Sequence, residues 1–185
     1  MVPDGTANPL TQEDLGDTPD DGRRYESIGG DLIVSPISTP EHQRLLARLV
    51  LLFATFVNSQ RLGEVLFAPV DALVFDHDRV QPDLIIVARE RRSTIGGAFI
   101  SGAPDLVLEV LSPSTHHLDR VRKAALYATS GVREYWLVDA ETRTIEVFVL
   151  TGQHFEPVRQ GAGVARSLLL PRLEVDFDPL FADAG

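Results

Sequence analysis

The chain contains no cysteine, so disulfide bonds and thiolate chemistry are excluded along all 185 residues. No apolar run reaches the roughly 18 residues that a membrane-spanning helix needs. The first 22 residues lack the basic start and the apolar core of a secretory signal. These absences favour a protein of the cytoplasm, which is a reducing compartment, with no membrane as partner.

Basic residues are fewer than acidic ones. The formal net charge is −10, which argues against a dedicated nucleic-acid binder, because such proteins usually carry a basic surface. Residues 1–22 hold six acids and no Lys or Arg, so the remaining chain carries 17 basic against 21 acidic residues. The charge weakens a role in nucleic-acid binding without excluding it.

The composition divides the chain into two parts. Residues 1–22 mix Pro, Gly, Asp and Thr without hydrophobic periodicity, so we predict an acidic, flexible N-terminal arm. Residues 23–185 are long enough to bury a substantial core and are predicted to form one domain.

Two helices are predicted. Thr39-Pro40-Glu41 combines a hydroxyl cap, a proline at the first position and an acid near the positive end of the helix dipole. An apolar stripe then follows helical spacing to about Asn58: Leu45, Leu46, Leu49, Phe53 and Phe56. The second helix spans about Leu118 to Ser130 and stops at Gly131. Its stripe of small residues is expected to pack on the sheet: Val121, Ala124, Ala125 and Ala128.

The remaining apolar segments read as strands. Arg24 to Ile37 is predicted to be a strand pair that turns at Gly29-Gly30. Further strands are predicted at Val65–Phe75, Leu84–Ala88, Leu106–Leu111, Glu134–Asp139, Thr144–Leu150 and, more weakly, Leu168–Asp176. Arg89 to Gly102 is predicted to be an exposed loop, and residues 179–182 a short turn. This order predicts an α/β fold with a mixed β-sheet flanked by helices.

Two carboxylates lie at apolar positions of the predicted sheet. Asp83 directly precedes Leu84–Ala88, and Glu109 lies inside Leu106–Leu111. A buried carboxylate needs a cation, a set of hydrogen bonds or a raised pKa. If the two strands are neighbours, both acids can point to one edge and bind Mg²⁺ or Mn²⁺, which needs only one or two carboxylates. The alternative is that Asp83 is a turn residue and Glu109 pairs with an arginine.

Two other aspartates are weaker candidates. Asp105 follows Pro104 and is interpreted as a turn residue at the start of its strand. Asp71 lies within the run Val65–Phe75 and is a third candidate ligand.

Lys123 is the only lysine, and the other 16 basic residues are arginines. A lysine can orient a water, stabilise charge on a phosphoryl oxygen or shuttle a proton, whereas an arginine does not give up its proton. The alternative is a surface ion pair with Asp119, four residues earlier. Lys123 lies far round the helix from the small-residue stripe, so the spacing leaves both interpretations open.

Other polar residues are possible site members. His42 falls on the apolar stripe of the first helix and can be either a core residue or a contact to metal or phosphate. Glu41 is one position off that stripe, and Glu26 lies on the first predicted strand. His116 and His117 are adjacent, so their side chains diverge and do not predict a metal pair.

Several motifs in order resemble the Uma-two family, within the PD-(D/E)XK superfamily of restriction-endonuclease-like proteins. The matching segments are Val80-Gln81-Pro82-Asp83-Leu84, Gly102 to Thr115, Lys123, Tyr127, and Gly131 to Asp139. The resemblance runs from about Arg24 to Phe181 and includes Pro40-Glu41-His42-Gln43 and Leu173-Glu174-Val175-Asp176.

The resemblance implies a restriction-endonuclease-like core with extra N- and C-terminal strands. It implies that Asp83 and Glu109 bind Mg²⁺ or Mn²⁺ and that Asp83, Glu109 and Lys123 are catalytic. The superfamily's lysine two residues after the second acid is replaced here by Leu111, so Lys123 on the following helix is expected to take its place. A further site residue from the first helix would be Glu41 or His42.

By the same resemblance, the substrate is expected to be nucleic acid, DNA rather than RNA, and the protein a homodimer. The leading hypothesis is therefore a metal-dependent endonuclease. Two alternatives stay open: a non-catalytic dimerising or regulatory module on the same fold, which the acidic charge and Leu111 favour, and a hydrolase of small phosphodiesters.

Overall fold

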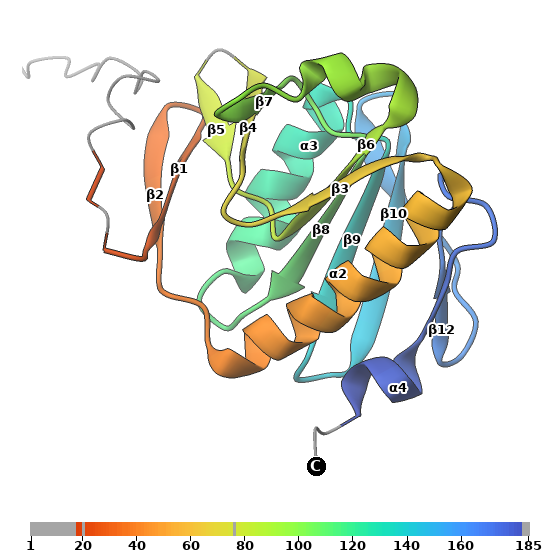
Figure 1. Cartoon of the computed structure of the whole chain (residues 1–185). Coiled ribbons are helices and arrows are strands. Elements are labelled where there is room, and N and C mark those ends of the chain that lie inside the picture. The colour runs from red at the N-terminus through yellow and green to blue at the C-terminus, as the bar shows by residue number, and fades with distance from the viewer. Residues whose placement is uncertain (1–17, 20, 76, 183–185) are drawn as a thin grey trace, which may run out of the picture.

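A computed structural model describes residues 18–19, 21–75 and 77–182, so most of the predicted arm, residues 1–22, lies outside the described part. Its centre is a mixed six-stranded sheet with the strand order β11-β10-β9-β8-β6-β3 (Figure 1). In chain order these strands are β3 (Gly63–Phe67), β6 (Leu84–Ala88), β8 (Leu106–Leu111), β9 (Glu134–Asp139), β10 (Thr144–Thr151) and β11 (His154–Pro157). Only β8 and β9 run parallel; their neighbours are antiparallel.

A second sheet of five shorter strands stands beside the first and has the order β2-β1-β5-β4-β7. Its strands are β1 (Arg24–Ile28), β2 (Asp31–Ser35), β4 (Asp71–Phe75), β5 (Asp78–Val80) and β7 (Phe99–Ser101). The turn between β1 and β2 is formed by Gly29 and Gly30, with φ of 62° and 81°. Both angles favour glycine, so the hairpin predicted from the sequence is confirmed.

Helices cover both faces of the central sheet (Figure 1). Helix α2 (Pro40–Gln60) crosses one face, and its start is capped by the Thr39 side chain, which accepts a hydrogen bond from the His42 N–H. On the other face, a π-helical turn (Leu118–Lys123) leads into α3 (Ala124–Ser130), which ends at Gly131 with φ of 93°. A short helix α4 (Phe177–Phe181) follows a two-stranded sheet, β12 (Val164–Arg166) and β13 (Glu174–Asp176).

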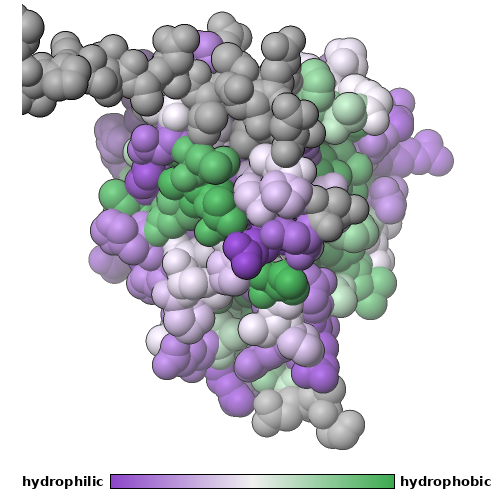
Figure 2. Space-filling view, turned by 90° about the vertical axis from the view of Figure 1, so that its left-hand side faces the viewer, coloured by the Kyte–Doolittle hydropathy of each residue, from purple (hydrophilic) through white to green (hydrophobic). Residues whose placement is uncertain are grey.

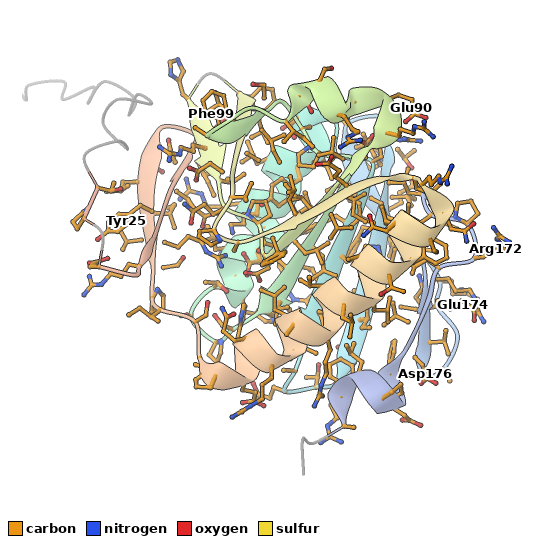
Figure 3. The ribbon with its side chains drawn as sticks, viewed as in Figure 1. Tyr25, Glu90, Phe99, Arg172, Glu174 and Asp176 are labelled. Carbon is orange, nitrogen blue, oxygen red and sulfur yellow. The ribbon has the colours of Figure 1, made fainter. Side chains whose placement is uncertain are left out.

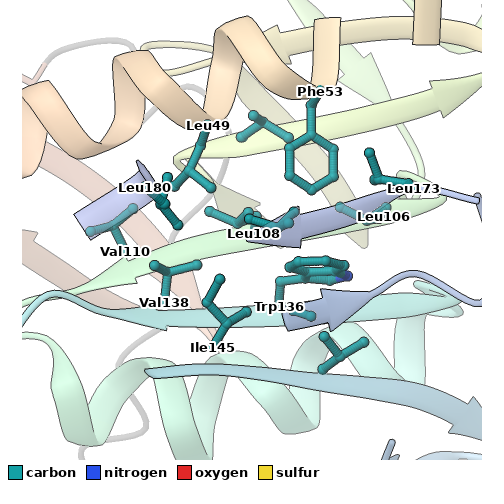
Figure 4. Close-up of a cluster of buried hydrophobic side chains, with 14 of the residues drawn as sticks. Leu49, Phe53, Leu106, Leu108, Val110, Trp136, Val138, Ile145, Leu173 and Leu180 are labelled. Carbon is teal, nitrogen blue, oxygen red and sulfur yellow. The ribbon is translucent and has the colours of Figure 1, made fainter. Parts of the chain in front are cut away.

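The larger core lies between α2 and the central sheet (Figure 4). Leu49 and Phe53 of α2 point onto Leu108 of β8 and Trp136 of β9. The rings of Phe53 and Trp136 meet edge to face with centroids 5.4 Å apart, a favourable aromatic geometry. The apolar stripe predicted from the sequence is therefore the face of α2 that packs on the sheet.

The opposite face of the central sheet packs on α3 and the second sheet. Because side chains alternate along a strand, Leu106, Leu108 and Val110 face α2 while Val107 and Leu111 face α3. Glu109 shares the parity of the α3-facing residues, and it is almost fully buried. The alternation thus places an acid inside the second core.

Three segments differ from the prediction. The run Val65–Phe75 is two strands in different sheets, because Pro69 cannot donate a ladder hydrogen bond and the chain leaves the central sheet there. The predicted loop Arg89–Gly102 contains a 3₁₀-helix (Arg89–Thr94) and β7, whose Ile100 is buried. The weak strand Leu168–Asp176 is a turn that ends in β13, preceded by β12.

The β1–β2 hairpin carries exposed apolar side chains. Figure 2 looks onto this side of the molecule and shows apolar residues gathered into a patch. Exposed apolar residues of the hairpin and of the segment after it are Leu32, Val34 and Ile37. Strand β2 is an edge strand, the kind of surface on which the expectation of a homodimer rests.

Of the helices in the described part of the chain, none combines the length and the apolar character that crossing a lipid bilayer requires.

Candidate functional site

Asp83 and Glu109 converge on one side of the central sheet. Strands β6 and β8 are antiparallel with Leu84 opposite Leu108, a register that places Asp83 opposite Glu109. The Asp83 N–H donates to Glu109 Oε2 over 3.3 Å, and both side chains are about 99% buried. The two acids that stood out in the sequence are therefore neighbours.

Asp83 is held by three groups from three elements. Its Oδ1 accepts from Arg24 Nη2 of β1 at 2.7 Å, and its Oδ2 accepts from the Val110 N–H at 2.8 Å. Nε2 of His42, in the first turn of α2, lies 3.2 Å from Oδ2. Burial alone would raise the pKa of Asp83, but the hydrogen bond from His42 and the charge of Arg24 hold it well below its usual range. Asp83 is thus an ionised carboxylate.

Glu109 is held from the opposite side by the helix. Its Oε1 accepts from Lys123 Nζ at 3.1 Å and from the Tyr127 hydroxyl at 2.8 Å. Burial raises the pKa of Glu109 to about 8, against the pull of Lys123 and with the help of the charges of Asp119 and Asp83. The other carboxylate oxygen of Glu109, Oε2, faces Asp83 and accepts from its N–H.

Lys123 is enclosed by three carboxylates. Its Nζ lies 3.0 Å from Glu26 Oε1, 3.1 Å from Glu109 Oε1 and 3.5 Å from Asp119 Oδ1. Burial alone would lower the pKa of Lys123, but Glu109 and Glu26 raise it well above its usual value. The charged ammonium form of Lys123 is therefore favoured.

The predicted orientation of this helix was right for Ala124 and Ala128, which pack toward the sheet, and wrong for Val121 and Ala125. Lys123 and Tyr127 face the sheet, whereas Val121 is half exposed and Ala125 is on the surface. The π-helical turn changes the angular spacing before α3, so a stripe counted at the α-helical period points elsewhere. Because three carboxylates surround it, Lys123 is stable in the interior.

Strand β1 supplies two further charged side chains. Arg24 and Glu26 alternate with Tyr25, which lies on the outer side of the hairpin (Figure 3). Glu26 Oε1 accepts from the Gln81 N–H at 2.9 Å and also meets Lys123, so β1 is linked to both the Asp83 segment and the helix.

The buried charges at this site do not balance. Four carboxylates stand against two permanent cations, Arg24 and Lys123; the four are Glu26, Asp83, Glu109 and Asp119. Glu26 Oε2 and Asp119 Oδ1 are buried without a hydrogen-bond partner. Burial raises the pKa of Glu109 to about 8 and also raises that of Asp119, so below that pH protons offset part of the excess. When all four carboxylates are ionised, the excess of two negative charges in a low-dielectric interior matches the charge of one divalent cation.

The donors suit an ion that keeps part of its water shell. Asp83 and Glu109 together offer two neighbouring carboxylates, and Mg²⁺ binds through one or two of them. No cluster of three or more His, Cys, Asp or Glu side chains is arranged to hold an ion within residues 18–19, 21–75 and 77–182. The residues therefore fit Mg²⁺ or Mn²⁺ rather than an ion that requires a full set of protein ligands.

The site opens into a cavity of about 210 Å³. Its walls include Arg24, Asp83, Glu109 and a group of hydroxyl residues: Ser35, Ser38, Thr39, Ser112, Ser114 and Thr115. A larger neighbouring cavity of about 860 Å³ shares Thr39, His42 and Ser112 with it and is lined further by Glu41, His116 and His117. Of the two first-helix candidates, His42 contacts Asp83 directly, whereas Glu41 lies on the neighbouring cavity.

The other aspartates serve the scaffold. Asp105 is as buried as Asp83, but it accepts from the Ala88 N–H and pairs with Arg91 and Arg133 at the far ends of β6 and β8. Asp71 pairs with Arg79 of β5 and is not part of the site.

The sequence interpretation missed three members of the site. Arg24 was read only as the start of a strand, Asp119 only as a surface partner of Lys123, and Tyr127 only as part of a motif. The i, i+4 spacing of Asp119, Lys123 and Tyr127 was the available signal, because it places all three on one helical face. For Arg24 the signal was its alternation with Glu26.

The raised pKa of Glu109 predicts a pH dependence of stability in chelator. The folded carboxyl keeps its proton up to about pH 8, whereas the unfolded one loses it near 4.5. The folded state therefore binds more protons in this window, and the free energy of unfolding should fall as pH rises from about 4.5 to about 8. Glu109→Gln should flatten this slope in denaturant unfolding. Glu90→Gln, on the exposed 3₁₀-helix far from the hairpin (Figure 3), should keep it; an unchanged slope in Glu109→Gln would contradict the assignment.

Comparison with known proteins places this arrangement in a family. Residues 12–178 match the Uma2 family, described as "Putative restriction endonuclease". The match covers most of the chain, and the chain belongs to this family.

Two individual proteins are similar along most of their length. A crystal structure of "a putative nuclease belonging to DUF820" from Anabaena variabilis ATCC 29413 superposes with a TM-score of 0.76 at 20% identity, covering 94% of this chain and 98% of that one. The uncharacterized protein sll1609 of Synechocystis sp. is 25% identical over 164 residues, covering 83% of this chain and 84% of its own. The α/β fold with a mixed sheet flanked by helices, as in restriction-endonuclease-like proteins, is confirmed.

Proposed function

We propose that this protein is a metal-dependent endonuclease that hydrolyses phosphodiester bonds in nucleic acid, DNA rather than RNA. The observation that carries the proposal is the pair Asp83 and Glu109, facing each other on antiparallel strands at the wall of a cavity. Membership of the Uma2 family supports the reaction class.

Asp83 and Glu109 would hold Mg²⁺ or Mn²⁺. Such an ion, when bound, polarises the scissile phosphate and lowers the pKa of the attacking water. Asp83 is prepared for this role because it is ionised and oriented by His42 and the Val110 N–H. Glu109 must lose its proton to bind the ion, so ion binding should strengthen as pH rises toward about 8.

Lys123 and His42 act through the carboxylates. Lys123 holds Glu109 in position and supplies a fixed positive charge beside the cavity, which stabilises negative charge on a phosphoryl oxygen. His42 positions Asp83 through Nε2, while its Nδ1 is buried without a hydrogen-bond partner. Glu26 fixes Lys123 from the opposite side and links it to β1.

Cleavage assays test the proposal directly. Purified protein is incubated with plasmid, single-stranded DNA and RNA, each with Mn²⁺ or with chelator. We expect Mn²⁺-dependent cleavage of DNA that chelator abolishes. Absence of cleavage of every substrate, together with a folded protein, would contradict the enzyme and favour a non-catalytic module on the same fold.

A second candidate, a hydrolase of small phosphodiesters, is favoured by the charge of the neighbouring cavity. Its lining includes Glu41, Asp139 and Glu141 and, within the described residues, no Lys or Arg. A long polyanion would be repelled there, whereas a substrate with one phosphate need not enter it. Faster Mn²⁺-dependent hydrolysis of bis(p-nitrophenyl) phosphate than of plasmid phosphodiesters would favour this candidate.

A further inference from the structure

Arg24 lies against both of the acids that would hold an ion. Its Nη2 is 2.7 Å from Asp83 Oδ1, and its Nη1 is 4.0 Å from Glu109 Oε2. One guanidinium therefore spans both carboxylates from the side of the cavity, which it also lines.

The remaining oxygens of the two acids are engaged elsewhere. Asp83 Oδ2 accepts from the Val110 N–H and meets His42, and Glu109 Oε1 accepts from Lys123 and Tyr127. Asp83 Oδ1 and Glu109 Oε2, the two atoms that Arg24 spans, are the oxygens left most open to an ion, because Oε2 has besides Arg24 only the 3.3 Å contact from the Asp83 N–H. The ion and the guanidinium would compete for the same oxygens and repel each other.

We propose that Arg24 is an internal counter-cation that neutralises the acid pair in the metal-free protein, is displaced when a divalent ion binds, and then contacts the substrate phosphate. The proposal rests on the metal-dependent function proposed above and assigns Arg24 a role in it. The site is prepared for the exchange, because a divalent ion supplies two positive charges where Arg24 supplies one.

The cavity gives the displaced side chain a destination. Arg24 has a long side chain that is 18% exposed, and the cavity that it lines also offers hydroxyl groups, among them those of Ser35, Ser112 and Thr115. A planar guanidinium fits two oxygens of a phosphate at once. Arg24 would thus offset the negative charge of Asp83 before ion binding and hold the substrate afterwards.

Mn²⁺ titration by calorimetry tests the exchange on the full chain. Arg24→Gln should bind Mn²⁺ about 10-fold more tightly than the wild type, because the competing charge is gone. The same variant should cleave substrate about 10-fold more slowly or worse, because the phosphate contact is lost. Arg91→Gln is the matched control, since Arg91 pairs with the buried Asp105 outside the site, and it should bind Mn²⁺ as the wild type does.

Each outcome of the titration and of the cleavage assay supports or overturns a stated part of the proposal. Equal Mn²⁺ affinity in the wild type and Arg24→Gln would overturn the exchange while leaving the metal-dependent function standing. An equal gain in Arg91→Gln would reduce the effect to overall charge and overturn it too. Absence of Mn²⁺ binding in every variant would overturn both proposals, and faster cleavage by Arg24→Gln would overturn the phosphate contact.

A second measurement does not depend on the variant folding. The side-chain Nε–H signal of Arg24 is followed by NMR in the wild-type protein as Mg²⁺ is added. We expect a large shift and averaging of this signal at saturation, because the ion pair with Asp83 is broken. An unchanged signal at saturating Mg²⁺ would overturn the exchange.

Discussion

Asp83→Asn is expected to lower Mn²⁺-dependent cleavage by about 100-fold or more, with little change in overall structure. The amide keeps the size of the side chain and can still accept from the Val110 N–H, but it has no negative charge to offer an ion. It also leaves Arg24 without its charged partner. Activity on plasmid DNA, measured with Mn²⁺, gives the fold-change.

The chain provides an unusually close control for this substitution. Pro82-Asp83-Leu84 and Pro104-Asp105-Leu106 are the same tripeptide, both aspartates are about 99% buried, and both pair with arginine. Asp105→Asn removes a structural charge at the far end of the strands, so it should lower stability but leave cleavage within a few-fold of the wild type. Equal losses of cleavage in the two variants, at matched folded fractions, would show that Asp83 acts through stability alone.

These two tripeptides also show how much of the site can be predicted from the sequence. Local sequence does not separate them, because each acid precedes a buried strand after a proline. The antiparallel pairing of β6 with β8 distinguishes the two aspartates. It places Asp83 opposite Glu109 and Asp105 at the other end of these strands. The interpretation of Asp83 and Glu109 as neighbours needed only the assumption that their strands are adjacent, and that assumption was correct.

The rest of the site depends on packing between distant segments. Arg24 meets Asp83 across 59 residues of sequence, and no spacing rule predicts such a contact. Whether Lys123 reaches the site stayed open because the α-helical period was assumed through Leu118–Lys123, where the helix has a π turn. The elements with strong periodicity, such as α2 and the hairpin of β9 and β10, were predicted within a few residues.

Lys123→Met is expected to destabilise the fold by about 3–5 kcal/mol at pH 8, because breaking a buried ion pair leaves uncompensated charge in the interior. Methionine has a similar length and shape, so the loss measures charge rather than a cavity. The orphaned groups are Glu26, Glu109 and Asp119, all within 3.5 Å of Nζ in the wild type. Chemical denaturation in chelator gives the free energy of unfolding.

The loss of stability in Lys123→Met should depend on pH. At lower pH the orphaned carboxylates can take up protons, so the difference between Lys123→Met and the wild type should shrink from pH 8 toward pH 5. Adding Glu109→Gln should recover part of the lost stability at pH 8, because one of the three unpaired charges is removed. A deficit that is the same at both pH values, with no recovery in the double variant, would mean that Lys123 contributes through packing and not through its charge.

Lys123→Arg separates charge from shape. It keeps the positive charge but forces a larger, planar group into a space where Lys123 is 1% exposed, so we expect a loss of about 1–3 kcal/mol from overpacking, smaller than that of Lys123→Met. We therefore expect the free energy of unfolding to be lowest in Lys123→Met, intermediate in Lys123→Arg and highest in the wild type, because acids enclose the cation. That same enclosure favours the protonated form of Lys123, so Asp83 and Glu109 are the groups of the site that we propose to bind an ion.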